Sequence, residues 1–261
     1  MAFNRFLAAA ALAASIGSAA HADGWYIGGS IGLNNQSESD NSGRTGAFTT
    51  GNLGDGTTLD VADGTPYGWN TEFDDGEAYS VEAGLRYDTG WRSGIELSWT
   101  NADVDTHTGV TLGGGSIDGL DAASIAGSPD ALGVTVGDVV ADGRGDISST
   151  SVFVNAYYDF NRGGAIEPYL GVGIGYSDVE VTYQPSGINV INDSESKFAY
   201  QAKAGATYAL NPQWGIYAEY AYRATEDIEL ENQLFPGTLE IENQQHLVSV
   251  GVRYRFDSFG Y

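Results

Sequence analysis

The sequence has no cysteine, few basic residues and no long apolar run beyond its N-terminal region, and each shortage excludes a class of protein. Without cysteine, neither disulfide bridges nor thiolate metal sites are available. The 11 Lys and Arg residues stand against 35 Asp and Glu residues, and a formal net charge of −24 is unsuited to binding nucleic acid phosphates. Beyond the N-terminal region, no stretch approaches the about 20 apolar residues of a transmembrane helix. A disulfide-rich module, a nucleic-acid-binding protein and a helical membrane protein are therefore not expected.

The N-terminal residues have the layout of a secretory signal peptide. Arg5 supplies a positive charge, residues 7–16 are apolar, and the small residues that follow end in an Ala-x-Ala motif at residues 20–22. A basic start, a short apolar core and such an ending predict cleavage after the motif. We therefore expect a signal peptide at residues 1–22 and a mature chain at residues 23–261, whose formal charge moves from −24 to −25 because Arg5 is removed.

Eight segments of the mature chain alternate apolar and polar residues with a period of two, which predicts β-strands. In one of them, Leu170, Val172 and Ile174 share one face while glycine occupies the other. Across all eight, one face is apolar and the other carries glycine, small polar residues and charged residues. The expected strands are residues 25–33, 79–87, 91–99, 152–160, 168–176, 198–208, 214–223 and 248–256.

Aromatic residues mark both ends of the apolar face on four of these strands, eight residues apart. At about 3.3 Å per residue and a tilt of ~40°, eight steps rise roughly 20 Å, close to the ~25 Å apolar band of a membrane barrel. Tyr and Trp prefer the headgroup level of a bilayer, so the apolar face is expected to face lipid. The predicted aromatic girdle consists of Tyr79 and Tyr87, Trp91 and Trp99, Tyr200 and Tyr208, and Trp214 and Tyr222.

The connections between the expected strands alternate strictly between short and long. Short turns fall at residues 88–90, 161–167 and 209–213, and long connections at 34–78, 100–151, 177–197 and 224–247. This alternation is typical of a barrel with periplasmic turns and extracellular loops. We therefore expect an all-β protein, an eight-stranded antiparallel up-and-down transmembrane β-barrel with long extracellular loops.

The face opposite the apolar one gathers six of the ten basic residues of the mature chain, together with three glutamates. Buried charges persist when they are paired and hydrogen-bonded, and eight strands enclose a space that side chains can fill. We predict an internal ion-pair network that plugs the barrel. Its members are Glu82, Arg86, Arg92, Glu96, Lys203, Glu219, Arg223, Arg253 and Arg255.

Two details of this network can be specified. A hairpin centred at Asn211 would set Lys203 directly opposite Glu219. Four of the arginines are expected near the periplasmic mouth, with Asp88, Asp159 and Asp257 as candidate partners. A selectivity ring in a conducting pore is the alternative interpretation of these charges, and eight strands favour the packed polar interior.

Four stretches of the expected strands have a family likeness: residues 155–160, residues 167–176, residues 198–201 with Gly205, and residues 250–256. They resemble the outer-membrane β-barrel domain family, which includes bacterial surface antigens, opacity-type adhesins, "porin family" proteins and relatives of the outer-membrane protein A barrel. The closing segment is also similar to the C-terminal signal that barrel-assembly machinery recognises, with Phe256 or Tyr261 as its terminal aromatic. The resemblance implies an outer-membrane barrel and no single activity.

Candidate chemistry is sparse in the mature chain. His246 and Ser249 are close in sequence but lie on opposite faces of a strand, so a Ser-His-acid hydrolase is not expected. Acidic residues near Asp103 and in the glycine-rich stretch 113–121 faintly resemble calcium-binding repeats, but one imperfect copy favours a flexible, solvated loop. We expect no enzymatic activity, no cofactor and no metal site.

The leading function is therefore structural and surface-exposed. We expect an outer-membrane barrel that contributes to envelope integrity or surface interaction, in the manner of an adhesin or surface antigen. The alternative is a small-solute porin or a channel for hydrophobic molecules, which strands in the second long connection or a gap in the interior network would favour. Expected partners are outer-membrane lipids and lipopolysaccharide, the assembly machinery, and a host or surface ligand at the acidic loops.

Overall fold

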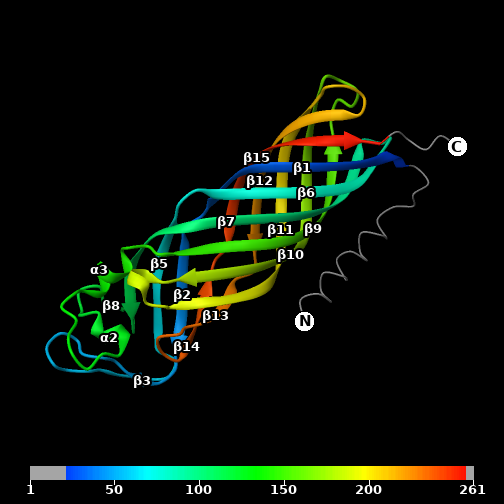
Figure 1. The fold of residues 1–261 in the computed structure, drawn as a ribbon. Coiled ribbons are helices and arrows are strands. Elements are labelled where there is room, and N and C mark those ends of the chain that lie inside the picture. Colours follow the sequence, from blue (N-terminus) through cyan, green and yellow to red (C-terminus); the bar gives the residue numbers. More distant parts are fainter. Residues whose placement is uncertain (1–21, 257–261) are drawn as a thin grey trace.

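The computed structural model describes residues 22–256, in which eight long antiparallel strands close into a barrel (Figure 1). All eight strands expected from the sequence are present. Residues 1–21 of the predicted signal peptide lie outside the described residues, as does Asp257. The signal peptide stays a prediction. The barrel strands are β1 (Ala22–Gln36), β6 (Gly76–Tyr87), β7 (Trp91–Leu112), β9 (Gly145–Asp159), β10 (Ile166–Tyr183), β11 (Ile191–Ala209), β12 (Trp214–Thr225) and β15 (Gln244–Arg255).

The barrel closes because its first and last strands pair. Each strand is hydrogen-bonded to its neighbours in chain order, and β1 completes the ring with β15, where Ile31 lies opposite Val250. Within residues 22–256 the membrane-spanning ring therefore presents no open strand edge. A closed ring is the form in which a β-sheet can lie in lipid, since every backbone group finds a partner.

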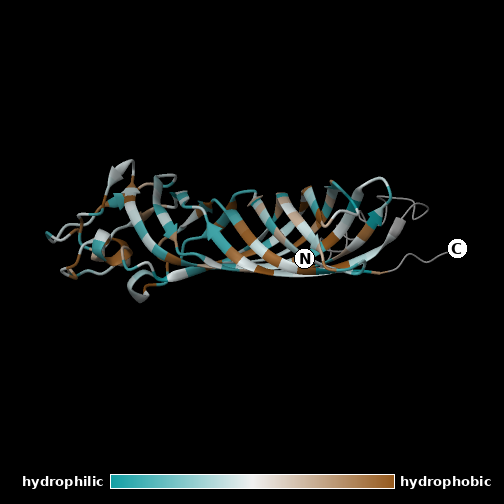
Figure 2. Cartoon of the chain, turned by 90° about the horizontal axis from the view of Figure 1, so that it is seen from above, coloured by the Kyte–Doolittle hydropathy of each residue, from teal (hydrophilic) through white to brown (hydrophobic). Residues whose placement is uncertain are grey.

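The two faces of the barrel differ sharply. Ile31, Val172 and Val250 on the outer face are 61%, 65% and 60% exposed, whereas Arg92 on the inner face is 1% exposed. Figure 2 shows apolar and hydrophilic residues alternating along the barrel strands. An apolar outer face and a polar inner face are the reverse of a water-soluble barrel and fit a lipid environment.

The long connections form an ordered body at the end of the barrel opposite the short turns (Figure 1). We call it the loop module and define it as residues 37–75, 101–150, 177–197 and 226–243. Four barrel strands, β7, β9, β10 and β11, continue into it, and a sheet in the order β13-β14-β2-β5 adds to the edge of β7. Its own strands are β2 (Ser39–Thr45), β3 (Phe48–Thr49), β4 (Asp60–Val61), β5 (Pro66–Phe73), β8 (Gly115–Ser116), β13 (Ile228–Glu231) and β14 (Gly237–Ile241), and its helices are α2 (Ala123–Ala126), α3 (Val136–Val140) and the 3₁₀ turn η2 (Pro185–Gly187).

The hydrophobic pattern inverts where the strands enter the loop module. Within the barrel, β10 turns Leu170 and Val172 outward, at 56% and 65% exposure. Further along the same strand, Val179, Val181 and Tyr183 point inward and are fully buried. Because the alternation of the strand continues unbroken, the apolar residues have changed face. The loop module therefore has an apolar core and a polar surface, as in a water-soluble domain.

The expectation that residues 113–121 form a flexible loop is wrong. Gly115 and Ser116 pair with β7, and Asp118 accepts the backbone amide of Val110 at 2.8 Å. Val110 and Val136 belong to the buried core of the module. Each long connection carries too few apolar residues to fold alone, and ordering follows because several connections combine theirs in one core.

None of the helices among residues 22–256 is long and apolar enough to cross a membrane.

Candidate functional site

The barrel interior contains a carboxylate that receives several side-chain donors. Lys203 Nζ donates to Glu96 Oε2 at 2.6 Å and to Glu219 Oε1 at 2.9 Å. Glu96 also accepts from Asn155 Nδ2 at 2.7 Å and from Arg223 Nη2 at 3.2 Å. All five residues are buried. Two cations and two carboxylates thus share hydrogen bonds, which is the condition under which buried charges persist.

Arg92 forms the centre of the next layer, nearer the short turns. Its fully buried side chain places Nε 3.3 Å from Asp159 Oδ1 and Nη1 3.5 Å from Glu82 Oε1. The guanidinium also lies over the rings of Tyr157 and Tyr169, at 4.0 and 4.9 Å from their centroids. Carboxylates and aromatic faces together stabilise a guanidinium that water does not reach.

The remaining arginines lie at the short-turn end of the barrel. Arg86 Nη2 lies 3.4 Å from Glu167 Oε2 and 3.8 Å from Asp159 Oδ2, and Arg255 donates to the same Glu167 oxygen. Arg253 has no carboxylate at salt-bridge distance among the described residues. Its Nη1 donates to Thr207 Oγ1 at 2.9 Å, and its guanidinium lies over aromatic rings. The arginine cluster expected at the periplasmic mouth is thus present at the short-turn end, and Arg253 is the member that lies against aromatic rings.

The partners of these arginines differ in part from the expected ones. Asp159 contacts two of them, Asp88 is exposed in its turn, and Asp257 lies outside the described residues. Glu167 is an interior residue that the sequence pattern did not predict. It lies one residue before the start of the expected strand and on the same face as Tyr169. Extending the period-two pattern by one residue would therefore have found it.

The expected register between β11 and β12 is wrong by two residues. Lys203 lies opposite Ala221, and Glu219 lies opposite Gly205. The reason is the turn, where Asn211 Oδ1 accepts hydrogen bonds from two backbone amides that follow it, which moves the centre of the hairpin one residue onward. Lys203 still contacts Glu219 diagonally, because Glu219 lies opposite Gly205, the next residue on the same face as Lys203.

The barrel interior leaves little space for water. The gap beside Lys203 and Glu219 has a volume of about 20 Å³. This volume holds about one water molecule. Tyrosines fill the rest, and inward-facing glycines make room for them: a Cβ atom on Gly94 would lie 2.5 Å from Tyr26 Oη. Side chains therefore occupy the cross-section of the described barrel, as eight strands allow.

The eight residues of the predicted aromatic girdle lie on the outer face in two groups. Tyr79 and Trp99 are opposite each other in the pairing of β6 and β7. At the short-turn end the aromatic band is wider than expected, because Tyr158 packs against Trp91 with ring centroids 5.4 Å apart. Toward the loop module lie Tyr79, Trp99, Tyr200 and Tyr222, and toward the short turns lie Tyr87, Trp91, Tyr208 and Trp214.

The two described histidines have different surroundings. His246 Nδ1 shares a hydrogen bond of 2.7 Å with Tyr220 Oη near the outer face, while Ser249 lies on the opposite face of β15. His107 is buried in the loop module, where its Nδ1 lies 2.8 Å from Thr71 Oγ1. Within residues 22–256, neither imidazole has a serine and a carboxylate at hydrogen-bond distance.

The acidic residues of the second connection support backbone structure. Asp121 accepts hydrogen bonds from the amides of Leu132, Ala123 and Gly133, and these bonds lower the pKa of its carboxyl group. No group of three or more His, Asp or Glu side chains in the described part of the chain is placed to hold a metal ion. The resemblance of residues 113–121 to a calcium repeat therefore has no geometric support there.

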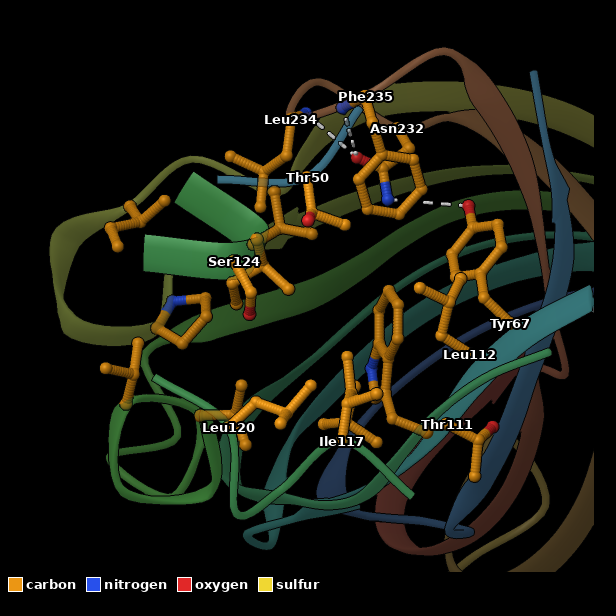
Figure 3. A pocket seen from close by; sticks show the side chains of 18 of the residues that line it. Thr50, Tyr67, Thr111, Leu112, Ile117, Leu120, Ser124, Asn232, Leu234 and Phe235 are labelled. Carbon is orange, nitrogen blue, oxygen red and sulfur yellow. Dashed lines mark hydrogen bonds between the residues drawn. The ribbon is translucent and has the colours of Figure 1, made fainter. Parts of the chain in front are cut away.

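An apolar pocket of about 120 Å³ lies in the loop module (Figure 3). Figure 3 shows Tyr67 and Ser124 on different walls and Asn232 at the rim, where its side chain holds the amides of Leu234 and Phe235. No local pattern in the sequence predicts this pocket, since its residues come from all four long connections.

His107 lines the pocket and is held neutral. Burial lowers the pKa of its imidazole from 6.5 to about 4, against a smaller opposing effect of Asp142. Burial disfavours the charged form of histidine, because a buried imidazolium loses its hydration. The pocket therefore presents an uncharged imidazole at neutral pH.

Comparison with known proteins places the chain in a family. The family model described as "Outer membrane protein beta-barrel domain" matches residues 6–256. The chain belongs to this family. It is accordingly an outer-membrane protein, and its ring of eight strands is the membrane-spanning part.

Individual relatives are distant. The outer membrane protein PagN of Salmonella typhimurium is 28% identical over 99 residues, which cover 36% of this chain and 41% of PagN. An uncharacterized protein of Brucella suis is 25% identical over 259 residues, covering 89% of this chain and 85% of that protein. This chain thus spans less than half of PagN.

Solved structures match the chain over most of its length at low sequence identity. OprG from Pseudomonas aeruginosa matches with a TM-score of 0.46 and 15% identity, covering 91% of this chain and 98% of OprG. Neisserial surface protein A matches with a TM-score of 0.44 and 14% identity, covering 90% of this chain and 99% of that one.

Proposed function

We propose that this protein is a plugged outer-membrane barrel that displays the loop module on the cell surface, where it contributes to envelope integrity or surface interaction. The observation that carries the proposal is the filled interior. Glu96, Lys203 and Arg92 are buried in the middle of the barrel, and the gap beside Lys203 holds about one water molecule. A solute passing through would have to break this network, with a penalty of several kcal/mol for each charge left unpaired.

The loop module supports the display role. The strands of the second connection surround an apolar core instead of a water-filled channel, so their presence does not favour a pore. The outer surface of the module is acidic, and Glu229 lies opposite Glu240 on neighbouring strands. Like charges at this distance repel, and a cationic ligand would relieve the repulsion. A basic host or surface ligand, or lipopolysaccharide bridged by divalent cations, is the class of partner that suits this surface.

The remaining parts of the proposal concern export and chemistry. Removal of residues 1–22 after export and recognition of the closing strand by the barrel-assembly machinery follow from the sequence pattern. A role without catalysis is part of the proposal, and it is supported by the surroundings of His107 and His246, neither of which has the neighbours of a hydrolytic triad within the described residues.

Single-channel recording in a planar bilayer tests the proposal. The refolded mature protein is expected to give a silent membrane, while a gel-shift assay verifies that the barrel is folded. Reproducible open steps whose ion preference changes on Lys203→Met or Glu219→Gln would refute it. Those steps would identify a small-solute pore.

A further inference from the structure

We propose that the loop module binds a small neutral carbonyl compound with an apolar body in the pocket of Figure 3. This proposal concerns the loop module alone and is independent of whether the barrel conducts. It is based on the shape of the pocket, on the polar atoms that line it and on the charges that it lacks.

The pocket suits a compact apolar group. Its volume is about 120 Å³, and aromatic and branched side chains line it, among them Tyr67, Val110, Ile117 and Phe235. Cavities somewhat larger than this hold a benzene ring. Ile117 and Phe235 are only partly buried, so the pocket has a route to solvent. The pocket is therefore close in size to one six-membered ring, part of which can extend through the open side.

Four polar atoms in the lining have no hydrogen-bond partner within residues 22–256. They are Trp69 Nε1, His107 Nε2, Ser124 Oγ and Tyr183 Oη. These side chains belong to residues that are 9%, 3%, 3% and 0% exposed. Unmade hydrogen bonds of buried groups are uncommon, and each destabilises a protein by about 1–3 kcal/mol. Four of them around one apolar pocket indicate that a polar group of a ligand belongs there.

The hydrogen-bond network determines which polar group is needed. Asn41 Nδ2 donates to Thr71 Oγ1 at 2.6 Å, and Thr71 Oγ1 lies 2.8 Å from His107 Nδ1. The hydroxyl hydrogen of Thr71 can go to His107 Nδ1, and in that arrangement the single proton of the neutral ring is on Nε2. Indole Nε1 of Trp69 can only donate. In that arrangement both ring atoms require an acceptor, such as a carbonyl oxygen, and Trp69 Nε1 requires one in either tautomer of His107.

The two donors come from neighbouring strands. Trp69 of β5 and His107 of β7 have ring centroids 6.2 Å apart and planes at 83°. Trp69 lies at a break in the register of these strands, where β7 has one extra residue and Gly109 has a φ of +68°. Such bulges direct a side chain away from the regular pleat.

Charge selects a neutral ligand. Apart from the neutral His107, no titratable acid or base that is charged at pH 7 lines the pocket among the described residues. A carboxylate ligand would lose its hydration without a cation to replace it, and a ligand cation would find no carboxylate. The formal charge of −24 disfavours an anion further.

Indole N–H resonances in NMR spectra test the proposal on the mature protein in lipid nanodiscs. The probe is cyclohexanone, and its comparator is methylenecyclohexane, which has the same shape but no acceptor. We expect cyclohexanone to shift the Trp69 signal downfield and saturably, and to bind about tenfold more tightly than the comparator. The signal of Trp99 on the lipid face reports partition into the membrane and should shift without saturation.

Three outcomes would overturn the proposal: no saturable shift of Trp69, equal affinity for the two compounds, or parallel shifts of Trp69 and Trp99. Variants add an independent comparison. His107→Phe keeps a ring but removes the donor, and should weaken cyclohexanone by about tenfold with little effect on methylenecyclohexane. His246→Phe, outside the pocket, should change neither. Equal behaviour of the two histidine variants would also refute the proposal, and limited proteolysis checks that the module of each is folded.

Discussion

Glu96 is a carboxylate with almost no contact with water, and its place in the barrel depends on the side chains around it. Lys203 and Arg223 donate to it from β11 and β12, on the far side of the barrel from its own strand. A charge this deeply buried is stabilised only together with all its hydrogen-bond partners. Removing one partner should therefore lower the free energy of unfolding by more than one hydrogen bond contributes.

Lys203→Met tests this dependence. Because Glu96 and Glu219 would lose a buried cation, we expect the free energy of unfolding to fall by about 3–5 kcal/mol. Urea unfolding in detergent micelles, followed by tryptophan fluorescence, measures the change. The matched control is Lys197→Met, whose ion pair with Glu195 is partly exposed and should contribute under about 1 kcal/mol. Equal losses in the two variants would contradict the role of the network.

His107 gives the loop module a dependence on pH. The pKa of its imidazole is about 4 in the folded protein against an ordinary value of 6.5, so the unfolded chain binds the extra proton between these values. The stabilisation is complete above about pH 6.5, and it is lost progressively down to about pH 4, by about 3 kcal/mol in total. Amide hydrogen exchange in β5 at pH 7 and pH 4.5 measures the loss.

Two variants separate this effect from other groups. His107→Asn should abolish the acid loss, while His246→Asn should keep it. Asp146 acts in the opposite sense: burial, with Asp103 and Glu180 nearby, raises the pKa of its carboxyl group, so its protonation in acid favours the folded module. If the loss of stability in acid persists in His107→Asn, another group causes the pH dependence.

At the scale of the element, β10 shows what the sequence could predict and what it could not. The alternation of Leu170, Val172 and Ile174 predicts the strand and its lipid face correctly. The shift of the apolar residues to Val179 and Val181 is visible in the sequence too. It resembles the start of a loop, because a switch of face breaks the pattern by which a strand is recognised.

The turns and the module were harder to predict, for two physical reasons. The β11–β12 register depends on how Asn211 binds backbone amides, which the residue types alone do not determine. The pocket depends on contacts between connections more than a hundred residues apart, such as those joining Tyr67 to Asn232. Local periodicity carries no information on either.

The lipid face of β15 yields a prediction on assembly. Val250→Arg places a charge on the outer face, opposite Ile31, and should destabilise the inserted barrel by about 2–4 kcal/mol if the site is near the midplane of the bilayer. The expected result is failure of insertion into lipid vesicles, measured by the gel shift of the folded barrel. Thr238→Arg, on the exposed surface of β14, is the control and should insert normally. Normal insertion of Val250→Arg would mean that the assigned faces are reversed.

At the scale of the whole molecule, two bodies share four strands. β7, β9, β10 and β11 run through both, while the other barrel strands end near the boundary and β2, β5, β13 and β14 take their place. The ring of eight strands is complete without the added ones, so the barrel should be stable by itself. The module lacks this independence, since its core is built on extensions of barrel strands.

Deletion of residues 37–75, with a short turn in their place, tests this asymmetry. We expect the barrel to keep its gel shift, whereas residues 101–150 become sensitive to protease because the core loses Tyr67 and Trp69. A barrel that fails to fold without residues 37–75 would show that the module contributes to its stability. A module that stays resistant would show that the shared core is not what orders it.

The seam between β1 and β15 joins Ile31 to Val250, more than 200 residues apart along the chain. The strand β1 therefore keeps an unpaired edge until the last barrel strand, β15, has been exported. Closing so long a loop has a high entropic penalty, and pairings between distant strands form slowly. A chain interrupted before β15 would leave the edges of β1 and β12 unpaired, so closure of the whole ring depends on the twelve residues of this one strand.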